Sequence, residues 1–205
     1  GSYPWNRGGT YGTQLVIHSP LGGRLNRALG YALRKKFCRS FNFELQASAT
    51  DDSVVLSLGP HHSFALDDVV RYLHPATIPD TLTQAVLDQA PFLSRWRWNL
   101  NRSLVVLRQR AGRRNPPPIQ RMEADDIMAA VFPGAAACQE NITGPIEVPD
   151  HLLVRQTIHD TLTEALDADG LVELWERIGR DEVRVHCRDT TEPSVLAHEI
   201  LTARP

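Results

Sequence analysis

The spacing of apolar residues predicts a chain that mixes short strands with amphipathic helices. Residues 14–18 form a short apolar run, and residues 41–58 hold two apolar stretches around a polar turn, which predicts a strand and a β-hairpin. Residues 182–188 alternate apolar and polar side chains and predict one more strand. Apolar residues at helical spacing predict helices over 24–39, 66–73, 79–90, 91–110, 121–132, 151–166, 171–178 and 193–203. The expected fold class is therefore α+β, with a small antiparallel sheet and a mainly helical second half.

Changes in composition set the expected boundaries. Residues 1–12 are rich in glycine and aromatic residues without periodicity, so we expect an entry loop, whose first two residues resemble a cloning remnant. Residues 13–205 are expected to form one domain, with a possible subdivision near 111–118 into an α+β part and a mainly helical part. The sequence AGRRNPPP at that point predicts a rigid, basic, extended connector.

The net charge of −2 conceals a strong separation of charge along the chain. No acid precedes Glu44 and none lies between Asp88 and Glu123, and these two windows hold 15 of the 22 Lys and Arg residues. Trp96 and Trp98 alternate with the first arginines of the second window. Guanidinium groups match phosphate oxygens and indole rings stack on bases, so this pattern favours a nucleic-acid partner. If the two windows meet in the fold, they make one cationic face; the alternative is a solvated basic helix whose tryptophans lie in the core.

Other chemistry is weakly indicated. Cys38, Cys138 and Cys187 are odd in number and form no CxxC pair, which indicates free thiols and a reducing cytosol rather than disulfides. The adjacent His61 and His62 lack the accompanying ligands of a metal site. No apolar run approaches the ~20 residues of a membrane span, so no membrane partner is expected. Gly22-Gly23 before a helix is either a plain turn or a backbone cradle for a phosphate.

Several phrases together resemble one known family. These are TQLVIHSPLGGRLNRALGYALRKKF, FNFELQASATDDSVVLSL, RWRWN, PPPIQRMEADDIMAAVFP, ACQENI and PDHLLVRQTIHDTLTEALDADGL. In this order, from about residue 13 to the last residue, they resemble the C-terminal (DEAD/H-associated) region of the core of large helicase-related (Lhr) superfamily 2 helicases. The opening YPWNRG fits that family less well.

The resemblance implies an accessory part of an ATP-dependent helicase that moves 3′ to 5′ on single-stranded DNA, unwinds DNA and RNA:DNA hybrids, and is linked to DNA repair in the bacterial cytosol. The chain has no GxxxxGK[ST] phosphate loop and no DExH box, so we expect no catalytic residue and no cofactor in it. ATP and Mg²⁺ are expected in the motor domains of the parent helicase, whose RecA-like and winged-helix domains would be partners. The family's strand-contacting tryptophan matches Trp98, with Trp96 second. The other expected nucleic-acid-binding residues are Arg95, Arg97, Arg102, Arg113, Arg114, Arg24 and Arg27.

Two further function classes remain open from the sequence. The first is a chaperone-like docking module whose basic face binds an acidic partner or the helicase's own motor domains. The second is an independent hydrolase that uses Cys138 or a histidine pair, although no base accompanies the cysteine in sequence, and a structural thiol is the alternative.

Overall fold

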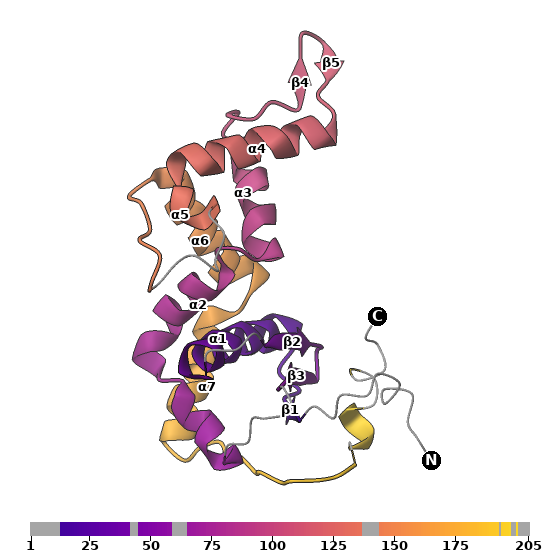
Figure 1. Ribbon diagram of the computed structural model, residues 1–205, viewed down its shortest axis with the longest axis vertical. Helices are drawn as coiled ribbons and strands as arrows, with labels where there is room; N and C mark the ends of the chain where they lie inside the picture. The colour runs from indigo at the N-terminus through magenta and orange to yellow at the C-terminus, as the bar shows by residue number, and fades with distance from the viewer. Residues whose placement is uncertain are drawn as a thin grey trace. The chain divides into compact units, whose positions relative to one another are not determined.

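The computed structural model describes residues 13–41, 45–58, 65–136, 144–192, 194–197 and 200 (Figure 1). The chain divides into two compact units, residues 1–82 with 166–205, and residues 83–165. We call them the sheet unit and the helical unit. The first division falls within α2 (Ile78–Val86). The predicted entry loop at residues 1–12 lies outside the described residues.

The sheet unit is built on a three-stranded antiparallel sheet. Its strands are β1 (Gln14–His18), β2 (Gln46–Ala49) and β3 (Ser53–Ser57), in the order β1-β3-β2. Leu56 of the central strand lies opposite both Leu15 and Ala47. Four of the five β3 residues are buried, because this central strand is paired on both edges and is covered by other parts of the chain.

Helix α1 (Gly23–Phe41) covers this sheet, as Figure 1 shows. Leu25, Leu29, Leu33 and Phe37 recur at helical spacing and are all buried, which is the face that the sequence pattern predicts. Helix α7 (Ala168–Gly179) packs against α1.

Short helices complete the sheet unit. The 3₁₀ segments are η2 (Leu66–Tyr72), η3 (Pro75–Thr77) and η6 (Val195–Ala197). The indole N–H of Trp175 on α7 donates to the Val70 carbonyl of η2 at 3.0 Å. Among the helices of the described residues, none has the length and apolar character that a bilayer crossing requires.

The helical unit is built on α3 (Ala90–Arg102), against which α4, α6 and η5 pack, while α5 packs on α4. These helices are α4 (Pro117–Val131), α5 (Pro133–Ala136), α6 (Leu152–Asp160) and a π-helical turn, η5 (Thr161–Ala165). Its core includes Phe92, Trp96, Leu100, Met128 and Val154, all buried. Along the chain, α3 and α4 are connected by a two-stranded antiparallel ribbon, β4 (Gln109–Arg110) and β5 (Arg113–Arg114).

The α+β fold class is confirmed, and the predicted hairpin is present as β2 and β3, although residue 41, its predicted start, ends α1. Three other local predictions are wrong. Residues 182–188 form no strand, because every residue but Val183 is exposed and no neighbouring strand pairs with them. The helix that begins near Pro91 ends at Arg102, not near Arg110. The predicted extended connector at 111–118 is instead the turn and second strand of the β4–β5 ribbon, followed by the start of α4. The predicted last helix at 193–203 lies largely outside the described residues.

Candidate nucleic-acid interface

Helix α3 places its two tryptophans in opposite environments. Trp96 is 1% exposed, and its indole N–H donates to the Ala124 carbonyl of α4 at 2.9 Å. Trp98 is 49% exposed. The two positions point about 200° apart on a helix, so one faces the core when the other faces solvent. Stacking on a base requires a solvent-accessible indole, which excludes Trp96 and leaves Trp98 as the candidate.

Two arginines share the exposed side of α3 with Trp98. Arg95, Trp98 and Arg102 are three and four residues apart, so they form one stripe along the helix, here called the α3 stripe. The Arg95 guanidinium pairs with Glu164 of η5 at 2.5 Å. The Arg102 side chain is exposed and forms no ion pair among the described residues. The α3 stripe therefore offers an aromatic face between one paired and one available cation.

Arg108 extends this surface from the loop that follows α3. Its guanidinium carbon lies 5.5 Å from the centre of the Trp98 ring, within cation–π range. The contact places a positive charge beside the indole, and strand-binding grooves commonly combine these two features. Arg97, by contrast, is half-buried on the flank of α3.

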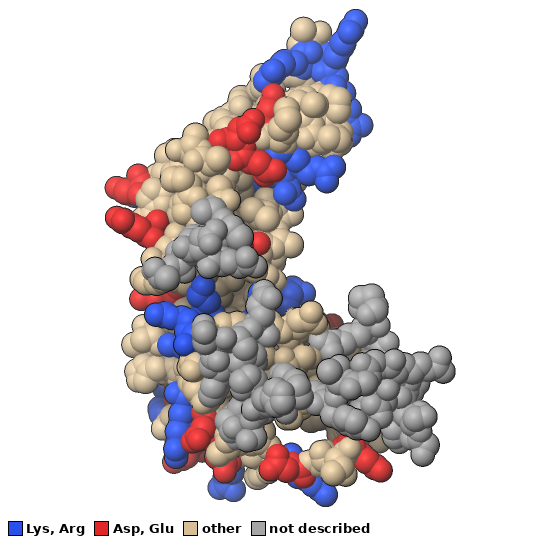
Figure 2. Space-filling view, viewed as in Figure 1, with Lys and Arg blue, Asp and Glu red and all other residues tan. Residues whose placement is uncertain are grey.

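The β4–β5 ribbon carries further arginines. Ala111 and Gly112 connect its strands with φ of 48° and 75°, the left-handed pair of a type I′ turn, for which glycine is favoured. Arg113 and Arg114 are exposed, whereas Arg110 pairs with Glu123 of α4 at 2.8 Å. In Figure 2 blue side chains gather at this end of the helical unit, with acidic side chains beside them. The ribbon is a cationic projection that one carboxylate of α4 anchors.

A buried polar network fixes the C-terminal turn of α3, and sequence reasoning missed it. The Asn99 side-chain amide donates to the Thr157 hydroxyl at 3.1 Å and to the Asp160 carboxylate at 2.9 Å, both on α6. The Asn99 carbonyl accepts the Ser103 hydroxyl at 2.8 Å. The available signal was an asparagine on the buried face of an amphipathic helix, three residues after Trp96, since a buried amide requires partners. This network holds the end of α3 against α6.

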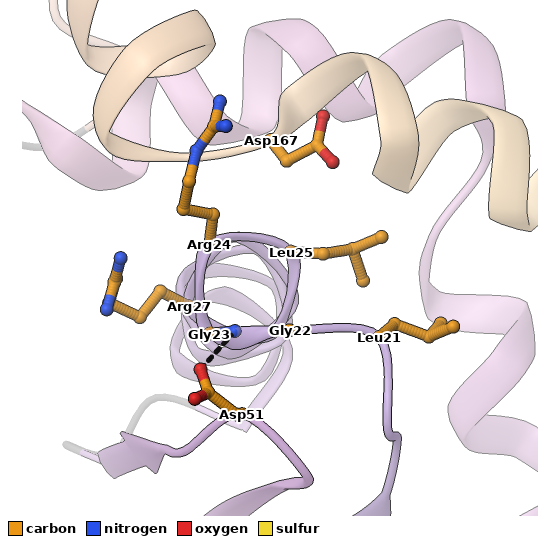
Figure 3. A pocket seen from close by; sticks show the side chains of 8 residues that line it. All are labelled: Leu21, Gly22, Gly23, Arg24, Leu25, Arg27, Asp51 and Asp167. Atoms are coloured by element: carbon orange, nitrogen blue, oxygen red, sulfur yellow. Dashed lines mark hydrogen bonds between the residues drawn. The ribbon is translucent and has the colours of Figure 1, made fainter.

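Arg24 and Arg27 lie in the sheet unit, at the start of α1. They line a hollow of about 360 Å³ with Asp51, Asp167 and the Gly22-Gly23 turn (Figure 3). The Arg24 guanidinium donates to the Leu166 carbonyl at 3.0 Å.

The Gly22-Gly23 turn does not offer a free phosphate cradle. The Asp51 carboxylate accepts the Gly23 N–H at 2.8 Å, the bond dashed in Figure 3. A side chain on Gly23 would meet that carboxylate at 2.6 Å, so close approach explains the glycine. The chain's own anion therefore occupies the helix N-terminus and would repel a phosphate, which favours the plain-turn alternative.

The two basic windows belong to different units, since α1 lies in the sheet unit and α3 in the helical unit. Packing within one unit therefore does not bring them together, and a shared cationic face stays a prediction. Within the helical unit, Arg95, Trp98 and Arg102 share α3 and Arg108 lies against Trp98, and the ribbon arginines belong to the same unit.

Metal and thiol chemistry gains no support from the described residues. No group of three or more His, Cys, Asp and Glu side chains in those ranges is placed to hold a metal ion. The predicted histidine pair at 61–62 and Cys138 fall outside the described residues. Cys187 is exposed overall, but partial desolvation of its thiol, and then a hydrogen bond to the Asp67 carboxylate, raise the pKa of that thiol. A raised pKa lowers the thiolate fraction, the opposite of what a nucleophilic cysteine needs.

Comparison with known proteins gives consistent matches along nearly the whole chain. The family model described as DEAD/H associated matches residues 6–197. The chain is similar to the Lhr helicase/probable uracil glycosylase of Mycolicibacterium smegmatis and to the Lhr helicase/uracil glycosylase of Escherichia coli, with 23% identity to each over 188 residues. It is also similar to the ATP-dependent helicase Lhr-Core of Saccharolobus solfataricus, with 21% identity over 189 residues.

These matches cover most of this chain but a small part of each relative. The alignments span 92%, 92% and 91% of this chain, and 12%, 11% and 20% of the respective relatives. Among solved structures, the helicase Lhr of Mycobacterium smegmatis bound to ssDNA and AMP-PNP matches with a TM-score of 0.71 and 23% identity. That match covers 92% of this chain and 22% of the other. The fold described above is therefore shared with one region of a larger protein.

Proposed function

The chain belongs to the DEAD/H associated family, and from that premise we propose that it is an accessory nucleic-acid-binding module of an ATP-dependent helicase. The proposed parent moves 3′ to 5′ along single-stranded DNA in the bacterial cytosol, unwinds DNA and RNA:DNA hybrids, and acts in DNA repair. Its RecA-like and winged-helix domains are the proposed neighbours of this module, and the motor domains hold ATP and Mg²⁺. Support comes from the similar proteins, which are named as helicases, one of them with ssDNA bound.

The half-exposed indole of Trp98 within an arginine surface is the observation that carries this proposal. A base stacks on the face of Trp98 that Arg108 does not cover, while Arg102 and Arg108 hold the flanking phosphates. Stacking on an aromatic side chain contributes about 1–3 kcal/mol per base. Each neutralised phosphate adds roughly 0.7 to the slope of log affinity against log salt on a single strand. Arg113 and Arg114 extend the same contact along the backbone.

The test is a salt series of strand binding. Fluorescence anisotropy with a labelled single-stranded oligonucleotide measures affinity for the wild type, Trp98→Ala and Arg102→Gln. We expect Trp98→Ala to weaken binding by about 5- to 150-fold without a change in salt slope. Arg102→Gln is expected to reduce the slope by roughly 0.7.

The matched control is Leu152→Ala, which removes another exposed apolar side chain of the helical unit, at the start of α6. It is expected to bind as the wild type does. The measurements are repeated in the full helicase, where the motor domains add their own contacts. Binding by the full helicase that is unchanged by Trp98→Ala would refute the proposed role.

Docking onto the helicase's own motor domains is a second candidate function. Ile119 and Met122 on α4 are large apolar side chains exposed to solvent, as expected of a surface that another domain covers. Flat or absent strand binding by the isolated chain, with a loss of affinity for separately prepared motor domains in Met122→Ser, would favour docking.

A further inference from the structure

The end of α3 places a leucine where helices usually place glycine. Ser103 is the C-cap, and Leu104 follows it with φ of 60°. The Leu104 N–H donates to the Asn101 carbonyl at 3.3 Å, and the Val105 N–H donates to the Leu100 carbonyl at 3.0 Å. These two bonds define a Schellman motif, whose left-handed residue is most often glycine because a Cβ is disfavoured there.

Burial does not compensate for the strain at Leu104. The residue is 72% exposed, and Val105 beside it is also exposed. Leu100 before them and Val106 after them are buried, so the chain is anchored on both sides of an apolar tip, here defined as Leu104 and Val105. Burial of the side chain does not offset the free-energy cost of this strained backbone conformation. Strain of this kind points to a function other than stabilising the fold.

The Asn99 network supports the turn that carries the apolar tip. Ser103, which precedes the tip, donates its hydroxyl to the Asn99 carbonyl at 2.8 Å and its N–H to the same carbonyl at 2.9 Å. Asn99 in turn is tied to Asp160 of α6. These bonds hold the backbone turn that presents the tip, and a preformed turn lowers the entropic cost of binding.

The charges around the apolar tip indicate its partner. Arg102 precedes it by two residues, Arg108 follows it by three, and the sequence holds no acid between Asp88 and Glu123. A nucleic-acid strand offers phosphates to such arginines and an apolar base face to a leucine, and apolar side chains do insert between bases in known interfaces.

We propose that the apolar tip contacts the bases of the bound strand, beside the base that stacks on Trp98. This inference rests on the proposed function and adds a second, apolar base contact to it. In this proposal the Leu104 side chain binds from the left-handed position at the expense of stability.

The test separates stability from binding with two substitutions. Leu104→Gly removes both the strain and the side chain, and it is expected to raise Tm by roughly 2–5 °C. It is also expected to weaken binding to a single-stranded oligonucleotide by roughly 3- to 20-fold, the effect of losing part of a leucine's burial. Leu104→Ala keeps the Cβ, so it should weaken binding similarly without the rise in Tm.

An abasic oligonucleotide of equal length identifies the partner. The difference between the wild type and Leu104→Gly should vanish on it, and the salt slope should be the same for both proteins. The inference is overturned if Leu104→Gly binds as the wild type does, or if its deficit persists on the abasic strand. Trp98→Ala is measured in parallel: if it too leaves binding unchanged, the proposed function fails, and if it alone weakens binding, only the role of the tip fails.

Discussion

Asn99→Ala is expected to destabilise the helical unit by roughly 2–4 kcal/mol. The amide donates one hydrogen bond to a buried carboxylate, Asp160, at 2.9 Å and one to the Thr157 hydroxyl at 3.1 Å. Bonds to charged groups contribute about 1.5–3 kcal/mol and neutral ones about 0.5–1.5 kcal/mol. Thr157 keeps its own bond to the Leu153 carbonyl at 2.7 Å, so most of the loss falls on the carboxylate.

The carboxylate makes a sharper prediction possible through a double-mutant cycle. In the wild type, Asp160→Asn replaces a charge-assisted bond by a neutral one and should cost about 1 kcal/mol. After Asn99→Ala, the buried carboxylate keeps one side-chain donor among the described residues, Gln156 at 2.7 Å. In the Asn99→Ala background, Asp160→Asn should therefore leave the free energy of unfolding unchanged or raise it, because an underpaired buried charge is costly. The expected coupling is about 1–2 kcal/mol, within the range for groups in one network.

The assay is equilibrium urea unfolding followed by far-ultraviolet circular dichroism, with hydrogen exchange of the α3 and α6 amides to assign the loss to this unit. Exchange should accelerate in both helices for Asn99→Ala and recover partly in the double variant. If the destabilisation of the double variant equals the sum of the two single substitutions within about 0.3–0.5 kcal/mol, the two side chains are not coupled and the network is refuted.

Three other outcomes are expected. Trp96→Phe should cost roughly 2–4 kcal/mol of unfolding free energy, because it leaves a cavity and removes the bond to α4; an unchanged urea midpoint would contradict that. Glu164→Gln should strengthen strand binding about 2- to 5-fold at low salt, because it releases Arg95 from an exposed ion pair, and the gain should be absent in the Arg95→Gln background. In a variant whose only cysteine is Cys187, the rate of reaction with iodoacetamide should keep rising above pH 9.0, the ordinary pKa of a cysteine thiol. The reason is that desolvation and Asp67 raise the pKa of the Cys187 thiol. A rate that reaches a plateau below pH 9.0 would contradict the raised pKa.

The sequence alone was sufficient where the deciding interactions are local. The apolar spacing of α1 predicted its buried face, because side chains three and four residues apart share one side of any helix. The same geometry separates Trp96 and Trp98 by about 200° on a helix, which permits one to face solvent while the other lies in the core. Charge separation was also visible, since it depends on order along the chain and not on packing.

Tertiary structure decided the features that depend on a distant partner. Trp96 is the buried indole because the Ala124 carbonyl of α4, 28 residues away, accepts its N–H. Arg95 meets Glu164 across 69 residues, so the sequence could not show that one predicted phosphate ligand is already paired. Residues 182–188 have the alternation of a strand and form none, because a strand needs an edge to pair with and alternation does not supply one.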